Sequence, residues 1–162
     1  MLAANLAGLL FQSCEAGAGL LGNALIHAGR RGLSADAARA EADAIVDHVI
    51  RHDPPLHNTR RFLADAVTVD GQRIEAGQTV LLVLAAAATV QPDAGWTFGA
   101  PGTGAPGHAC PGQGLARRHA SGALTHMLRA GADPAALASR FRYRPLPNAR
   151  VPQFAFSKEP TP

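Results

Sequence analysis

Residues 98–118, FGAPGTGAPGHACPGQGLARR, surround one cysteine with glycine and proline and place a histidine two positions before it. Cys110 is followed by Pro111-Gly112 and then by a helix-like run, so its sulfur is expected just before a helix N-terminus. Proline suits a first helical turn because its missing N–H would have no partner there. Backbone N–H groups and the helix dipole stabilise a thiolate in that position. Such a thiolate can serve as an axial metal ligand, tuned by amide hydrogen bonds to the sulfur.

Two further interpretations of Cys110 stay open. A nucleophilic cysteine needs a histidine base, and His108 or His119 could supply it, although no spacing singles either out. The segment could also be a plain linker that carries an incidental buried cysteine. A zinc site is disfavoured because no Cys-x-x-Cys or histidine pair stands near this cysteine. The second cysteine, Cys14, is predicted to be a small buried apolar residue.

Length and composition predict a single domain. The chain has 162 residues, of which 47% are hydrophobic, and this is enough to build a core. The formal net charge of +3 is diffuse and only 5% of the residues are aromatic, so a nucleic-acid partner is not expected. Part of the positive charge could instead meet a small anionic ligand. Two cysteines make no disulfide framework, which fits a reduced compartment.

The apolar N-terminal run, residues 1–26, raises the question of a membrane segment. No positively charged region precedes the run, and a spanning helix would bury Glu15 in lipid at a cost of about 3 kcal/mol. We therefore expect a helix buried within the protein, no membrane association and a cytoplasmic location. The glycines of this run lower its intrinsic helix stability, which predicts that other segments pack close to its backbone.

Apolar periodicity and turn residues predict the remaining elements. Asp70-Gly71, between two alternating runs, indicates a β-hairpin. Pro54-Pro55 ends the second helix and Gly131 ends the third. In chain order, the expected elements are helices at 2–28 and 34–51, a hairpin at 66–74, a strand at 79–84, a loop at 91–107, a helix at 111–129 and one or two strands at 141–156. The predicted fold is mainly α with a small β-sheet, an α+β fold.

The cysteine stretch resembles the haem-binding loop of cytochrome P450s. The similarity rests on His108-Ala109-Cys110-Pro111-Gly112, with Phe98-Gly99 before it and Leu115-Ala116-Arg117 after it. Segments 5–23, 49–62, 71–87 and 143–154 are similar, in the same order, to the central distal helix, the Arg-bearing helix with its proline turn, a sheet segment and the C-terminal hairpin of bacterial P450s. The chain thus resembles the C-terminal half of a P450 as one domain, 1–162, divided into 1–28, 34–51, 66–84, 98–130 and 141–156.

The resemblance implies a haem b cofactor and roles for five residues. Cys110 would be the thiolate ligand of the haem iron, and Phe98 would shield its sulfur. His108 and Arg61 would lie near the haem propionates, and Glu15 would be the catalytic acid on the distal side. Three of these residues have an ordinary alternative: a solvated arginine, an exposed loop histidine, and a capped or solvent-facing glutamate.

The sequence departs from the family pattern at four places. The Glu-x-x-Arg motif falls on His48-Val49-Ile50-Arg51, where histidine cannot replace a carboxylate that pairs with arginine through two hydrogen bonds. The family's Asn-Arg-Asp-Pro segment after the sheet, with the arginine that follows it, has no counterpart. Phe98 precedes Cys110 by twelve positions, more than in the family. The hydroxyl residue expected after the distal acid is replaced by Ala16-Gly17, so the acid–alcohol pair for proton delivery is incomplete.

We therefore expect a truncated P450-like haem-thiolate protein related to bacterial monooxygenases. By resemblance, one oxygen atom of dioxygen would be inserted into a small organic substrate, with electrons from a ferredoxin or flavin reductase. Turnover would be weak or absent, and whether the chain is an enzyme stays open. The alternative is a haem-free remnant that acts as a small helical interaction module and self-associates into a homo-oligomer. The retained His-x-Cys favours haem, whereas His48 favours the remnant.

Overall fold

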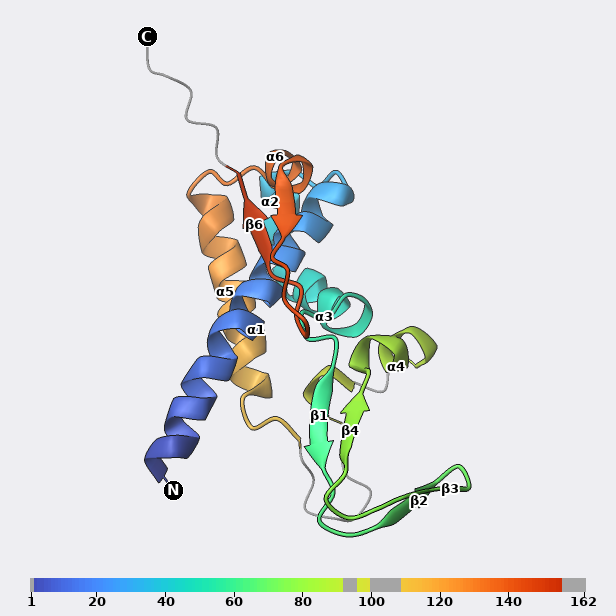
Figure 1. Cartoon of the computed structure of the whole chain (residues 1–162). Coiled ribbons are helices and arrows are strands. Elements are labelled where there is room, and N and C mark those ends of the chain that lie inside the picture. Colours follow the sequence, from blue (N-terminus) through green and yellow to red (C-terminus); the bar gives the residue numbers. More distant parts are fainter. Residues whose placement is uncertain (1, 92–95, 100–108, 156–162) are drawn as a thin grey trace.

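The computed structural model describes residues 2–91, 96–99 and 109–155. Within these ranges the chain forms a group of helices and three antiparallel pairs of short strands (Figure 1). The expected fold class, mainly α with a small amount of β structure, is confirmed. Long-range contacts join the long first helix to elements from the last third of the chain, and these contacts position the cysteine segment.

The core forms where the long helix α1 (Leu2–Arg30) crosses α3 (Ala42–His52) and α5 (Gln113–Arg129). The core side chains are apolar and come from the second half of α1, from α3 and from the C-terminal part of α5. The largest of them that are fully buried are Leu25, Ile26, Ile45, Val46, Val49, Ile50 and Leu124. On α3 these residues recur at helical spacing, as the sequence predicts, so one face of the helix is buried.

Helix α1 is long and apolar enough, by length and composition alone, to cross a membrane. The most apolar 18-residue window within Leu6–Arg30 has a mean hydropathy of 1.2, and 41% of that window is buried inside the fold. Leu20 and Leu25, in the second half of the helix, lie in the core, whereas Leu10, in the first half, is 70% exposed. The two halves of α1 therefore have different surroundings.

Glycine permits the close approach of other segments to α1, as expected from the sequence. A Cβ at Gly29 would lie 2.1 Å from the carbonyl oxygen of Pro134, at the start of helix α6 (Pro134–Ser139). A Cβ at Gly22 would lie 2.3 Å from Cγ of Pro152, and one at Gly19 would lie 2.6 Å from Cβ of Pro55. Three segments that are distant in sequence thus pack directly on the backbone of α1.

The helix expected at 34–51 is two helices, α2 (Ala35–Ala40) and α3, which begins at Ala42. The break is at Glu41, where the backbone leaves the helical region with φ −100° and ψ 11°. The carboxylate of Glu41 accepts a hydrogen bond from Nη1 of Arg31 at 2.8 Å, which ties the break to the end of α1. Ser34 caps α2 as predicted, and its hydroxyl accepts from the N–H of Ala37.

Two of the three strand pairs form between α3 and α4 (Leu84–Val90) and the third follows α6, and the hairpin prediction is confirmed. β2 (Val67–Val69) pairs with β3 (Gln72–Ile74) through Asp70 and Gly71, which both have positive φ, 49° and 75°. β1 (Thr59–Phe62) pairs with β4 (Thr79–Leu82), and β5 (Phe141–Tyr143) pairs with β6 (Pro152–Phe154). Pro152 is the first residue of β6, a position that an edge strand allows to proline, as expected.

Three short helices differ from the sequence prediction. The strand expected at 79–84 ends at Leu82, and helix α4 (Leu84–Val90) follows at once. Within the expected loop at 91–107, the described part contains a 3₁₀ turn, η2 (Trp96–Phe98). Helix α6 was not predicted. Its signal is Asp133-Pro134, because the Asp133 carboxylate caps the first turn and proline suits that turn.

The glycine contacts predict that alanine has opposite effects at two positions of α1. Gly29→Ala places a methyl group against backbone and lowers the free energy of unfolding by about 1–3 kcal/mol. Gly17→Ala, where nothing lies within 4 Å of the added Cβ, raises it by about 1 kcal/mol because alanine favours helix. Urea denaturation followed by circular dichroism measures both, and equal effects would contradict the packing.

Candidate functional site

Cys110 precedes helix α5, as the sequence predicts, but the helix begins at Gln113 and not at Pro111, because Pro111 and Gly112 form a turn; the Cys110 side chain is exposed. Its backbone N–H donates to the carbonyl oxygen of Phe98 at 2.8 Å, which holds the two ends of the intervening segment together. Its own carbonyl accepts from the N–H of Gln113 at 3.3 Å, in the first turn of the helix. The thiol therefore sits at a fixed backbone position at the helix start and faces solvent.

Phe98 belongs to the 3₁₀ turn η2, and its half-buried ring packs against the core. The guanidinium of Arg117, on α5, lies 5.6 Å from the centre of this ring, within cation–π distance. Arg117 also forms an ion pair with Asp47 on α3. The hydroxyl of Thr97 donates to the carbonyl oxygen of Ile50 at 2.7 Å. The turn that holds Cys110 is thus attached to α3 and α5.

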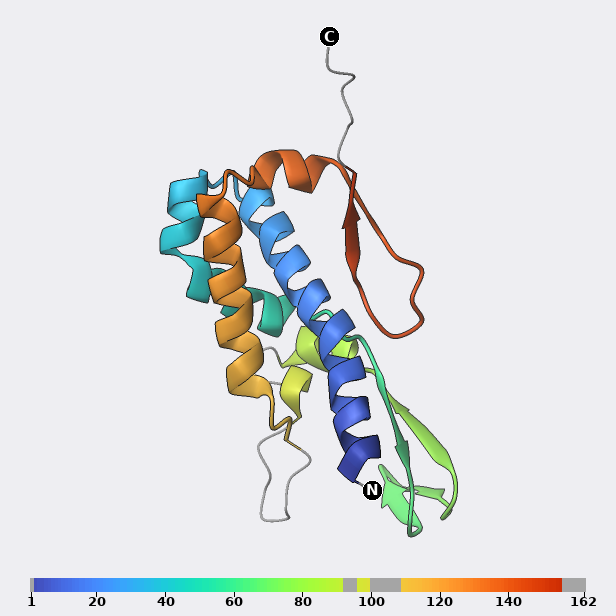
Figure 2. The same cartoon turned by 90° about the vertical axis from the view of Figure 1, so that its left-hand side faces the viewer.

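Arg61 lies on β1 and is exposed. Its Nη1 donates to the hydroxyl oxygen of Thr59 at 3.1 Å and to the carbonyl oxygen of Arg60 at 3.0 Å, both on the same strand. Figures 1 and 2 place β1 and β4 at the end of the molecule where α1 begins and α5 starts. Arg61 and Cys110 therefore belong to the same end of the fold.

Glu15 is half-buried on α1, and its Oε1 lies 3.3 Å from Nη1 of Arg144. Arg144 follows β5, and its backbone N–H donates to the carbonyl oxygen of Val151. The sequence alternatives for this acid were a capped or a solvent-facing glutamate, and the structure instead gives it a cationic partner from the other end of the chain. An ion pair this exposed contributes at most about 1 kcal/mol to stability.

Two other expected residues have different outcomes. His108 lies outside the described residues, so its prediction stays untested. Cys14 was expected to be buried, and this is wrong because its side chain is exposed. The reason is that the core covers only the second half of α1, and Cys14 precedes the first core residue, Leu20.

His48, in the place of the family's glutamate, belongs to a group of three imidazoles. The ring of His27, on α1, stacks on His48 at 4.1 Å between centroids, and His52 lies 4.4 Å from His48. Burial, together with the neighbouring His48 and Arg31, lowers the pKa of His27. Burial, His52 and Arg31 likewise lower the pKa of His48, while Asp53 acts in the opposite direction. Sequence analysis missed this group because His27 is distant along the chain.

Several large apolar side chains are exposed on elements at the end of the molecule where α5 starts. They come from the first half of α1, the start of α5 and the β1–β4 pair, which Figures 1 and 2 show at the same end of the molecule. We call this set the open apolar end: Leu6, Leu9, Leu10, Phe62, Leu81, Leu82 and Leu115. Leu10, Leu115 and Phe62 are 70%, 72% and 77% exposed. On the β1–β4 pair, Arg61 shares its face with Leu82, whereas Phe62 and Leu81 lie on the opposite face with Arg60.

A metal held by protein ligands alone is not supported in the described part of the chain. No group of three or more histidine, cysteine, aspartate or glutamate residues there is placed to hold an ion. Cys110 could therefore serve only as a single axial ligand to a metal that brings its other ligands.

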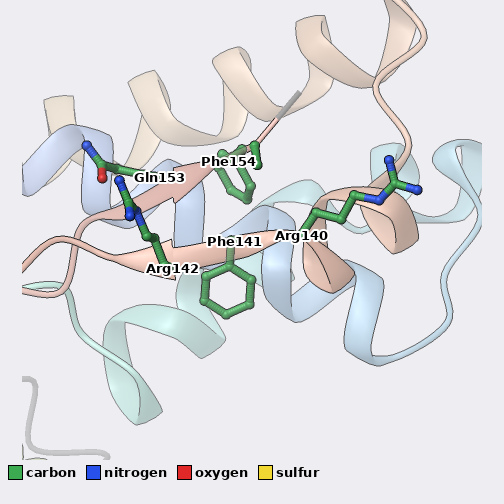
Figure 3. Close-up of a pocket in the computed structure, with 6 residues that line it drawn as sticks. Arg140, Phe141, Arg142, Gln153 and Phe154 are labelled. Carbon is green, nitrogen blue, oxygen red and sulfur yellow. The ribbon is translucent and has the colours of Figure 1, made fainter. Parts of the chain in front are cut away.

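A separate hollow of about 530 Å³ lies on the β5–β6 pair, where Phe141, Arg142 and Phe154 line it (Figure 3).

No protein-family model matches the chain, and no curated protein matches it. Solved structures of cytochrome P450s do match. The P450 monooxygenase TamI, with tirandamycin C bound, is 26% identical with a TM-score of 0.68 over 92% of this chain and 42% of that chain. A cytochrome P450 from the archaeon Picrophilus torridus is 22% identical with a TM-score of 0.68 over 86% of this chain and 45% of that chain. CYP164A2 from Mycobacterium smegmatis, with econazole bound, is 30% identical with a TM-score of 0.56. That match covers 70% of this chain and 32% of that chain.

These matches cover most of this chain but less than half of each of the three structures. Three further P450 structures are covered over 40%, 37% and 39% of their length. The expected resemblance is confirmed at the level of the fold, and the match is partial, as the sequence predicts.

The hydrogen bond from the Thr97 hydroxyl predicts that removing this hydroxyl lowers the stability of the fold. Thr97→Val leaves the Ile50 carbonyl oxygen without this donor and lowers the free energy of unfolding by about 1 kcal/mol. Thr89→Val is the matched control, because the Thr89 hydroxyl donates to the Ala85 carbonyl on an exposed helix surface, and its effect stays within about 0.5 kcal/mol. Urea denaturation measures both variants. An equal loss in the two would contradict the role of Thr97 in anchoring η2.

Proposed function

We propose, for a chain that has part of the cytochrome P450 fold, that it is a haem-thiolate protein of the monooxygenase type with Cys110 as the iron ligand. The observation that carries this proposal is the position of the exposed Cys110 thiol at the start of α5, beside the open apolar end. The hydrogen bond between the Cys110 N–H and the Phe98 carbonyl fixes that position before any ligand binds.

The residues at this end fit a haem group. Haem is a flat apolar ring with two carboxylate substituents and an iron that accepts one sulfur ligand from the protein. The open apolar end supplies uncovered leucines on α1, on α5 and on the Arg61 face of the β1–β4 pair, and their burial against the ring would remove apolar surface from water. Among the residues that the structure describes, Arg61 is the one that we assign to a propionate. His108 is proposed as a second propionate partner from its sequence position.

The protein's own residues would bind and orient the cofactor. Cys110 would donate its sulfur, and Phe98 would cover the sulfur side, held by Arg117 and the ion pair of Arg117 with Asp47. Haem supplies the redox chemistry by which one oxygen atom of dioxygen enters a small organic substrate, with electrons from a ferredoxin or flavin reductase. Glu15 would move protons on the opposite side.

We propose weak turnover, because proton delivery is hindered in two ways. The Glu15 carboxylate is paired with Arg144, and this pair must open before the acid can take up and release a proton. Ala16-Gly17 supplies no hydroxyl group beside it. The packing of the second half of α1 inside the fold supports a helix buried in protein, and we extend the proposal to a cytoplasmic location.

A second candidate is a haem-free module that self-associates. The observation in its favour is the same open apolar end, since large exposed apolar surfaces commonly mark interaction sites. The two candidates differ in what covers this end, a haem or a second copy of the chain.

If the chain binds haem through Cys110, substitution of the two cysteines is expected to have different effects on the haem absorption spectrum. Wild-type protein purified with haemin, reduced and exposed to carbon monoxide is expected to give the Soret position of thiolate-ligated haem. Cys110→Ser removes the sulfur and loses this band, whereas Cys14→Ser, the matched exposed cysteine on α1, keeps it. No Soret band in the wild type would overturn the haem proposal and leave the self-associating module.

If Arg61 pairs with a propionate, its removal is expected to weaken haem binding less than removal of the Cys110 sulfur does. Arg61→Gln removes one charged hydrogen-bond partner and raises the Kd for haem about tenfold, which corresponds to about 1.4 kcal/mol. Arg60→Gln is the control, because successive side chains of a strand point to opposite faces, and its Kd stays near the wild-type value. Absorbance titration with haemin measures both. The same Kd in the two variants would remove Arg61 from the site.

A further inference from the structure

Two histidines lie one helical turn apart near the end of α3. His48 and His52 are at positions i and i+4, so their side chains project from the same face of the helix. Both are exposed to solvent, and their ring centroids are 4.4 Å apart with an angle of 38° between the rings. The two imidazole rings are therefore adjacent and open to water and to small ions.

A third imidazole holds one of these rings in place. His27, on α1, stacks on His48 with 4.1 Å between centroids and 26° between the ring planes. His27 is more buried than His48, and its helix packs directly against α3. This stack reduces the freedom of the His48 ring, which lowers the entropy lost when that ring binds a ligand.

The charges around the pair have both signs. His52 is the last residue of α3, and the carbonyl end of a helix favours a positive charge. The carboxylate of Asp53 also lies near the group, although Arg150 pairs with it at 2.6 Å. Arg31, which directly follows α1, disfavours a bound cation by charge repulsion. It is itself paired with Glu41 at 2.8 Å. Both nearby arginine charges are thus partly balanced by carboxylates.

We propose that His48 and His52 chelate a divalent transition-metal ion such as Zn²⁺ or Ni²⁺. Imidazole nitrogen suits these metals, and two histidines spaced i, i+4 on one helix face can hold such an ion together. No three-residue ligand set is placed to hold an ion within the described ranges, so water completes the coordination. His27 is a positioning residue and not a ligand. The site is separate from Cys110 and does not depend on haem binding.

Isothermal titration of the haem-free chain with Zn²⁺, and separately with Ni²⁺, tests the proposal at neutral pH. The wild type is expected to bind one ion. His48→Asn and His52→Asn each raise the Kd by more than about tenfold, the least that loss of a supporting partner costs a metal site. His126→Asn is the control, since it removes an exposed histidine from α5, and it leaves the Kd unchanged. Equal binding in all four proteins would overturn the site.

Two further measurements separate ligation from a structural effect. His27→Phe keeps a flat ring against His48 and retains the wild-type Kd, and a loss as large as that of His48→Asn would overturn the two-imidazole assignment. Added Zn²⁺ raises the Tm of the wild type because the ion binds only when α3 is folded. The Tm of His52→Asn is expected not to respond, and a rise equal to that of the wild type would also contradict the proposal.

Discussion

The contact between α1 and the segments that cross its second half depends on glycine. Because Gly29 and Gly22 carry no Cβ, Pro134 and Pro152 approach the helix backbone to distances that any other residue would block. These contacts bring the end of the chain onto its beginning, and the same half of α1 packs against α3 and α5. On α1 the hydrophobic core forms on this half alone, and α3, α5, α6 and β6 are positioned by their contacts with the helix.

The first half of α1 has a different role because the core does not cover it. Leu6, Leu9 and Leu10 remain exposed, together with Leu115 at the start of α5 and Phe62 on β1. Cys110 stands at the same helix start, held by the Phe98 carbonyl. One end of the fold is therefore packed and stable, and the other presents a thiol beside apolar side chains. The proposal of haem binding rests on this asymmetry more than on any single residue.

Features set by local chemistry could be predicted from the sequence. Asp70-Gly71 forms the hairpin turn and Cys110 precedes a helix, because each depends on a few adjacent residues. Contacts between distant segments could not be predicted. The break at Glu41 is accompanied by its bond to Arg31, and Glu15 is paired with Arg144, a partner far along the chain. No periodicity carries information of that kind.

Iron K-edge X-ray absorption of the haem-loaded chain tests the central claim most directly, because it reports the atoms bound to iron. The account predicts one sulfur atom in the coordination shell of the wild type, absent from Cys110→Ser and retained in Cys14→Ser. A shell of nitrogen and oxygen alone in the wild type, or sulfur that persists without Cys110, would contradict it.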